Sequence, residues 1–166
     1  MEKRSNSLFG ELMIANPIKY NETDAQTFDK RAKDTVIALL NKGLYRAIEN
    51  PNKYGIDILL FNNDVFVQSI EVEVKRSFTT WETLYPKVHI PERKRKFFID
   101  DCSFFLLLNL YLDKFILIKG SEVLNCEVMN KFTSRSTVVL DKFFSVPLEK
   151  FQKFEIENGE LIRIEE

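Results

Sequence analysis

YGIDILL at residues 54–60 and IEVEVK at residues 70–75 decide the fold of this chain, because both are typical of β-strands yet carry acids where a buried strand carries Val or Ile. Side chains of a strand alternate between its faces, so Glu71, Glu73 and Lys75 share one face. A row of carboxylates beside a lysine on a core strand is costly unless a cation or ligand compensates it. With Asp57 on the neighbouring strand, the pattern suits Mg²⁺ held against a phosphate.

The segments around these strands predict a mixed succession of helices and strands. A helix is expected from Asp24 to Lys42, with a capping-box start and apolar residues at helical spacing. A second helix is expected to begin at Pro91 and to end near Asp100, after an irregular stretch over residues 77–91. Strands are expected at 44–48, 56–61, 65–75, 104–110 and 114–119, a short helix at 121–129 and a terminal hairpin at 154–164 on Asn158-Gly159, while 138–146 is ambiguous.

The order of these elements predicts an α/β fold, in which a mixed β-sheet is flanked by helices on both faces. An antiparallel hairpin leads through a helical crossover into a central buried strand, and β additions follow at the C-terminus. The length of 166 residues suits a single domain over 1–166, with its core at about 24–118 and the additions at about 119–166.

Composition limits the classes of function. The formal net charge is only −1, so any attraction to nucleic acid must come from a local patch. Fifteen Phe residues indicate either a core of large rings or an apolar surface for a partner. Cys102 and Cys126 fit no metal motif and no disulfide framework, which favours a reduced, cytoplasmic location. The apolar run 104–118 is too short and too interrupted to span a bilayer, and Gly is too scarce for a phosphate-binding loop.

The acids predict a cation site. Asp57 is expected to lie across from the region of Glu73, and two carboxylates this close bind a cation or share a proton. The backbone carbonyl of Val74 is a further candidate ligand. Glu71 is either an extra metal ligand or the partner of a basic residue such as Arg76. Lys75 is placed to orient an attacking water and to stabilise charge on a phosphate.

The set Asp57…Glu73-Val74-Lys75, after a long helix and before a crossover helix, resembles the PD-(D/E)xK nuclease superfamily, which includes restriction-endonuclease-like enzymes and archaeal-type Holliday-junction resolvases. The resemblance covers about residues 24–118 and implies an αβββαβ core. It implies hydrolysis of phosphodiester bonds in DNA with Mg²⁺ or Mn²⁺, RNA remaining open as a substrate. Metal binding falls to Asp57 and Glu73, and positioning of water or phosphate to Lys75. Ile56 stands where the family motif has Pro.

Basic residues near the acids are candidates for nucleic-acid binding. The run Arg93-Lys94-Arg95-Lys96 is either a solvated helix face or a set of phosphate contacts, which Arg76 and Lys87 would join. The resemblance places one basic residue of the crossover helix at the active site, either Arg93 or Lys94. His89, Trp81 and Tyr85 lie on the preceding loop, where the aromatic rings either stack on bases or pack over the core.

Two other classes of function stay open at this stage. The first is a catalytically inactive module that kept the nuclease fold and binds nucleic acid or protein. The second is a structural subunit whose Phe-rich surface forms an oligomer interface. A homodimer is compatible with cutting both strands of a duplex, and no membrane association is expected.

Overall fold

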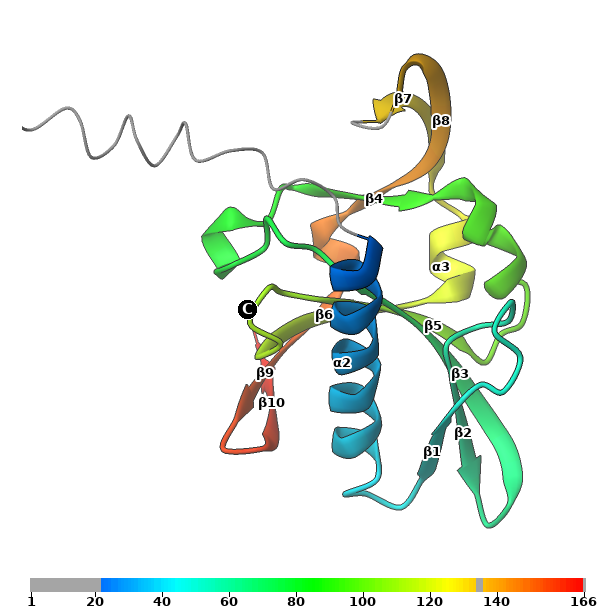
Figure 1. The fold of residues 1–166 in the computed structure, drawn as a ribbon, viewed down its shortest axis with the longest axis vertical. Helices are drawn as coiled ribbons and strands as arrows, with labels where there is room; N and C mark the ends of the chain where they lie inside the picture. The colour runs from blue at the N-terminus through cyan, green and yellow to red at the C-terminus, as the bar shows by residue number, and fades with distance from the viewer. Residues whose placement is uncertain (1–21, 134–135, 166) are drawn as a thin grey trace, which may run out of the picture.

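The computed structural model describes residues 22–133 and 136–165, which form one long helix and two β-sheets (Figure 1). In chain order the elements are α2 (Glu22–Leu40), β1 (Arg46–Glu49), β2 (Ile58–Asn62), β3 (Val65–Val74), η1 (Trp81–Thr83), β4 (Lys87–Pro91), η2 (Glu92–Phe97), β5 (Ser103–Leu108), β6 (Lys114–Lys119), α3 (Gly120–Leu124), β7 (Glu127–Thr133), β8 (Ser136–Pro147), η3 (Leu148–Lys150), β9 (Gln152–Glu157) and β10 (Glu160–Ile164).

The larger sheet has seven strands in the order β1-β2-β3-β5-β6-β9-β10. β3 and β5 run parallel, and the other neighbouring pairs are antiparallel. Two tight turns follow from residues that tolerate positive φ. Asn63 and Asp64 have φ of 49° and 63°, and Asn158 and Gly159 have φ of 50° and 75°. These turns produce the two hairpins predicted from the sequence, because paired positive φ values match the twist of a two-residue hairpin loop.

Helix α2 covers one face of this sheet. Ala32 and Val36 are buried, one helical turn apart, against Ile58 of β2 and Ile70 of β3. The predicted helix at 24–42 is confirmed. The predicted alternation of β3 is confirmed as well, since Ile70 packs in this cluster with Val72 and Val74 at its margin, which leaves Glu71 and Glu73 for the opposite face.

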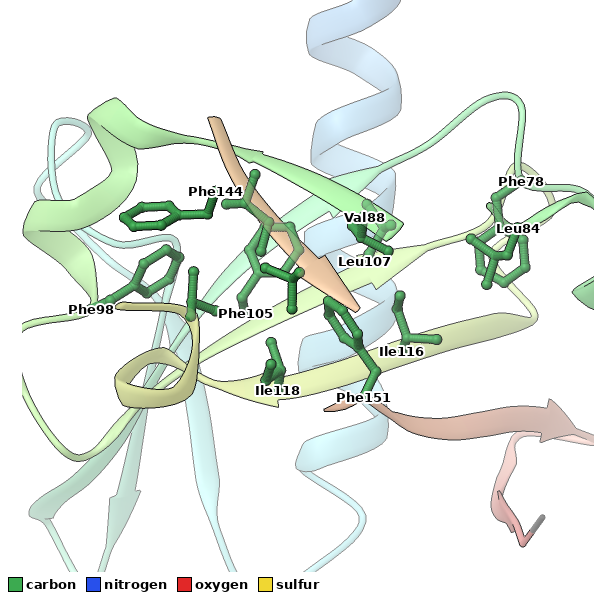
Figure 2. Packing of buried hydrophobic residues seen from close by; sticks show 13 residues of the cluster. Phe78, Leu84, Val88, Phe98, Phe105, Leu107, Ile116, Ile118, Phe144 and Phe151 are labelled. Carbon is green, nitrogen blue, oxygen red and sulfur yellow. The ribbon is translucent and has the colours of Figure 1, made fainter. Parts of the chain in front are cut away.

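The opposite face is covered mainly by a second sheet, in the order β4-β8-β7, together with α3. Figure 2 shows the apolar cluster between the layers, in which the rings of Phe98, Phe105 and Phe144 are fully buried. The expectation of helices on both faces is therefore met only in part on this side, where α3 is present but a β-layer does most of the covering. Part of the Phe-rich composition serves this core, because large rings fill the space between two sheets.

The crossover from β3 to β5 also differs from the expected helix at 91–100. Residues 87–91 form strand β4, which pairs with β8, and Glu92–Phe97 is a 3₁₀-helix. Pro91 ends a strand here rather than beginning an α-helix, since Val88 and Ile90 alternate towards the core. Phe98, packed edge-on against Phe105, then fixes the end of η2. The ambiguous segment 138–146 lies within β8.

The other predicted strands are confirmed with shifts of at most two residues at their ends, as expected for boundaries. The short helix predicted at 121–129 is confirmed only in its first part, because α3 ends at Leu124 and residues 127–129 belong to strand β7, which pairs with β8. The division into a core and C-terminal additions stays a prediction. No helix in the described ranges is long and apolar enough to cross a membrane.

Candidate functional site

The candidate site lies where β3 loses one of its neighbours. β2 pairs with β3 only as far as Ile58 opposite Ile70, whereas β5 accompanies β3 to Val74. Residues 71–74 consequently have an open backbone edge on the side that β2 has left. An open edge in the middle of a sheet exposes N–H and C=O groups that need partners.

Asp57 supplies the first partner. Its Oδ2 accepts a hydrogen bond of 2.9 Å from the backbone N–H of Val72, and its own carbonyl accepts one of 2.8 Å from the N–H of Asn50. The carboxylate is therefore held at the open edge, between Glu71 and Glu73 along the strand. This position agrees with the sequence expectation that Asp57 lies across from the acidic segment of β3.

The Val74 carbonyl faces the same edge. The N–H of Lys75 donates to the carbonyl of Leu108, across the pair with β5. In a trans peptide the C=O and N–H point in opposite directions, and the described chain contains no cis peptide bond. The carbonyl of Val74 therefore points away from β5 and towards the side where Asp57 lies.

Glu71 and Glu73 share one ammonium group. Lys94 of η2 places Nζ 2.7 Å from Oε1 of Glu71 and 3.3 Å from Oε1 of Glu73. The side chains of Glu71 and Lys94 are only 8% and 12% exposed, whereas that of Glu73 is 34% exposed. Oε2 of Glu71 is buried and has no hydrogen-bond partner among the described residues.

The pKa values of Glu71 and Lys94 are shifted because one ammonium group faces two carboxylates, those of Glu71 and Glu73. Burial raises the pKa of Glu71 to about 7, against the opposing effect of Lys94. Burial by itself lowers the pKa of Lys94, but Glu73 and Glu71 outweigh it and the net pKa is raised. The two directions are compatible, because a single ammonium balances one carboxylate and leaves the second, more buried one inclined to hold a proton.

Helix α2 adds an acid and a base one turn apart. Lys33 donates a hydrogen bond of 2.7 Å to Glu49 of β1, and its Nζ lies 3.7 Å from Oδ1 of Asp57. Burial tends to lower the pKa of Lys33, but Glu49 and Asp57 raise it overall. The pKa of Asp29 is raised, chiefly by burial and then by Asp57.

These groups enclose a cavity of about 240 Å³, which we call the acidic cleft. Its charged lining consists of Asp29, Lys33, Asp57, Glu71, Glu73 and Lys94. Carboxylates and a backbone carbonyl are ligands that Mg²⁺ accepts, so the donor set fits a hard divalent cation. Within residues 22–133 and 136–165, however, no three His, Cys, Asp or Glu side chains are already arranged to hold a metal ion. The ammonium groups of Lys94 and Lys33 offset part of this negative charge instead.

Lys75 does not line the acidic cleft. It lines a neighbouring cavity of about 560 Å³, which we call the basic pocket. Burial and then Lys131 lower the pKa of Lys75, and Glu73 opposes them. The full lining is Lys75, Tyr85, Pro86, Lys87, His89, Met129, Lys131 and Ser145. The structure thus gathers Asp57, Glu71 and Glu73 in one cavity and directs Lys75 into the next.

The basic residues predicted to bind nucleic acid also lie in different surroundings. Lys94 turns inward to the acids, and Arg93 stays exposed, so the structure distinguishes the two residues that the sequence left open. Arg95 pairs with Glu92 and lies over the ring of Phe144. Three further predicted residues lie elsewhere: Arg76 over the ring of Phe28, Lys96 over that of Phe97, and Lys87 in the basic pocket.

The loop aromatics also have different roles. Trp81 packs against Phe78 and donates a hydrogen bond of 2.6 Å from Nε1 to Glu155, so it belongs to the core. Tyr85 is 67% exposed at the basic pocket.

Two lysines of these cavities, Lys33 and Lys131, were not among the residues predicted from the sequence. Lys33 was detectable as a base one turn after Asp29, whereas Lys131 depends on long-range pairing of β7 that no local pattern signals.

Comparisons with known proteins give little beyond this geometry. No protein-family model matches the chain, and no curated protein matches it. Among solved structures, the Holliday junction resolvase Hjc of Archaeoglobus fulgidus, an archaeal hyperthermophile, is similar at 10% identity with a TM-score of 0.44. The similarity covers 76% of this chain and 85% of that one.

Proposed function

We propose that this protein is a divalent-metal-dependent endonuclease that hydrolyses phosphodiester bonds in DNA. The observation that carries the proposal is the convergence of Asp57, Glu71 and Glu73 on the open edge of β3, with one buried glutamate oxygen unpartnered. Burying several carboxylates close together costs free energy, and a bound cation would compensate that cost. The succession of a helix, three antiparallel strands and a strand parallel to the third supports an αβββαβ-like core, with a 3₁₀-helix in the crossover.

Each residue then has a role. Asp57, Glu73 and the Val74 carbonyl would hold Mg²⁺ or Mn²⁺, with Glu71 as a further ligand. Such an ion supplies a Lewis acid and lowers the pKa of a bound water. Lys94 keeps the glutamates together without metal, and its ammonium must give way when the ion enters. Lys75 lies in the neighbouring basic pocket, from which its ammonium group would contact the phosphate of the bound strand.

The test is cleavage of duplex and branched DNA by the purified protein with Mg²⁺ or Mn²⁺. Asp57→Ala and Glu73→Ala should each lower the cleavage rate by at least about a hundredfold, the scale of losing one electrostatic contributor. Lys75→Ala should lose cleavage with an unchanged circular dichroism spectrum. Asp34→Asn is the matched control, since this acid pairs with Lys30 on the exposed side of α2. Cleavage that survives in both Asp57→Ala and Glu73→Ala rules out the mechanism.

One observation favours a second candidate, an inactive nuclease-fold module that binds nucleic acid. Lys94 already occupies the space between the two glutamates, as a permanent cation would in a protein that has given up metal. Thermal unfolding with millimolar Mn²⁺ separates the two proposals. Stabilisation that is lost in Glu73→Ala supports the nuclease, and no stabilisation supports the inactive module.

A further inference from the structure

The basic pocket brings together cations from three separate elements. Lys87 and His89 come from β4, Lys131 from β7, and Lys75 follows the end of β3. Nζ of Lys131 lies 3.1 Å from Nδ1 of His89, so the ammonium donates to a neutral imidazole. No acidic side chain is among the residues that line this pocket. Three lysines in a lining without an acid repel one another and would be stabilised by an anion, although Glu73 of the neighbouring cleft offsets part of the charge at Lys75.

A buried hydroxyl group points to the same conclusion. Ser145 of β8 lines the pocket and is only 6% exposed, yet its Oγ has no hydrogen-bond partner within the described part of the chain. Buried hydroxyl groups are normally paired, because an unpaired one costs on the order of 1–3 kcal/mol. A phosphate oxygen would accept this hydrogen bond and face the ammonium groups at the same time.

The rest of the lining is mainly apolar. Tyr85, Pro86 and Met129 complete the wall, and Tyr85 and Met129 are both exposed. The cavity of about 560 Å³ lies within the range of about 300–1,000 Å³ that small-ligand pockets occupy. An anion alone would leave this apolar surface unused, whereas a phosphate with an attached aromatic base would use both parts.

We propose that the basic pocket binds one unpaired nucleotide, with its phosphate at Lys75, Lys87, Lys131 and Ser145 and its base against Tyr85. That the nucleotide belongs to a DNA strand entering the acidic cleft rests on the proposed function. Glu73 lines the cleft and Lys75 the pocket, and residues two apart on a strand are about 7 Å apart. Neighbouring nucleotides of one strand can therefore reach both sites.

The test is binding of fluorescein-labelled oligothymidylate in EDTA, where metal-dependent cleavage cannot occur. Fluorescence anisotropy across a salt series gives the affinity and its salt slope. Lys87→Gln/Lys131→Gln should lower the slope of log Kd against log salt by about 1.4, the effect of two lost phosphate contacts. Lys42→Gln/Lys119→Gln, an equal change of charge outside the pocket lining, should leave it unchanged. Tyr85→Ala should weaken single-strand binding about tenfold but leave duplex binding unaltered.

Each outcome decides the proposal. Equal slopes for the two lysine pairs, or equal effects of Tyr85→Ala on single strand and duplex, would overturn it. Thymidine monophosphate binding as tightly as the oligomer would assign the pocket to a free nucleotide instead. Because the assay has no catalytic readout, nucleotide binding without any cleavage would leave this inference standing while the proposed function fails.

Discussion

The acidic cleft and the basic pocket lie side by side at the end of β3 and handle charge in opposite ways. The cleft combines four carboxylates with two lysines, and its lysines are drawn into close ion pairs. The pocket contains three lysines and a histidine with no acid in its lining. The formal net charge of −1 conceals this division, because the whole chain contains nearly equal numbers of basic and acidic residues. The local charge of each cavity, and not the net charge of the chain, indicates which kind of ligand the cavity would bind.

The largest expected effect tests how far the cleft depends on its internal cation. Lys94→Met keeps most of the side-chain volume but leaves Glu71 and Glu73 uncompensated. At pH 8 we expect a loss of about 3–5 kcal/mol in the free energy of unfolding, the cost of an unpaired buried charge. At pH 5 the loss should be smaller, because Glu71, with a pKa of about 7, then holds a proton. Urea denaturation at both pH values measures this.

The control for this variant is Lys30→Met, which removes an exposed ion pair with Asp34 on α2. It should cost at most about 0.5 kcal/mol, since exposed i,i+4 pairs contribute little. Added Mn²⁺ should restore part of the stability of Lys94→Met, by about 2.7 kcal/mol at a hundredfold excess over Kd. Equal losses in the two variants would show that Lys94 is no more important than a surface lysine.

A smaller effect concerns the pH dependence of stability. Glu71 has a raised pKa, so between pH 4.5 and 7 the folded protein holds a proton that the unfolded chain has released. Its contribution to stability is therefore complete at low pH and is lost as pH rises through about 7, by on the order of 3 kcal/mol. Glu71→Gln should flatten this part of the curve and become more stable than the wild type above pH 7. An unchanged slope in thermal unfolding from pH 5 to 8 would contradict the assignment.

The sequence predicted the cleft better than the pocket, for a physical reason. Glu71 and Glu73 follow the period of two of a single strand, and Asp57 lies on the strand that forms a hairpin with it, so local patterns suffice. Strand β4 was missed because Pro91 also fits a helix start, and only its pairing with β8 decides the outcome. Lys131 reaches the basic pocket through the pairing of β7 with β8, to which no local pattern points. Lys75 was expected beside Glu73, and only the three-dimensional packing shows that it turns into the neighbouring cavity.

The smallest effect is a shift in the titration of His89, which is the only histidine of the chain and gives an unambiguous imidazole signal in NMR. Burial, then Lys131, Lys75 and Lys87, lower its pKa below the ordinary 6.5. Its contribution to stability should therefore be lost as pH falls below 6.5, opposite in sign to that of Glu71.

Lys131→Gln should raise the pKa of His89 in the free protein by removing a neighbouring cation. Oligothymidylate should raise it in the wild type, because a phosphate in the basic pocket stabilises the imidazolium. If the pKa of His89 is the same with and without the oligonucleotide, no phosphate binds in the basic pocket. The two regions would then differ in charge but not in the ligand that they bind.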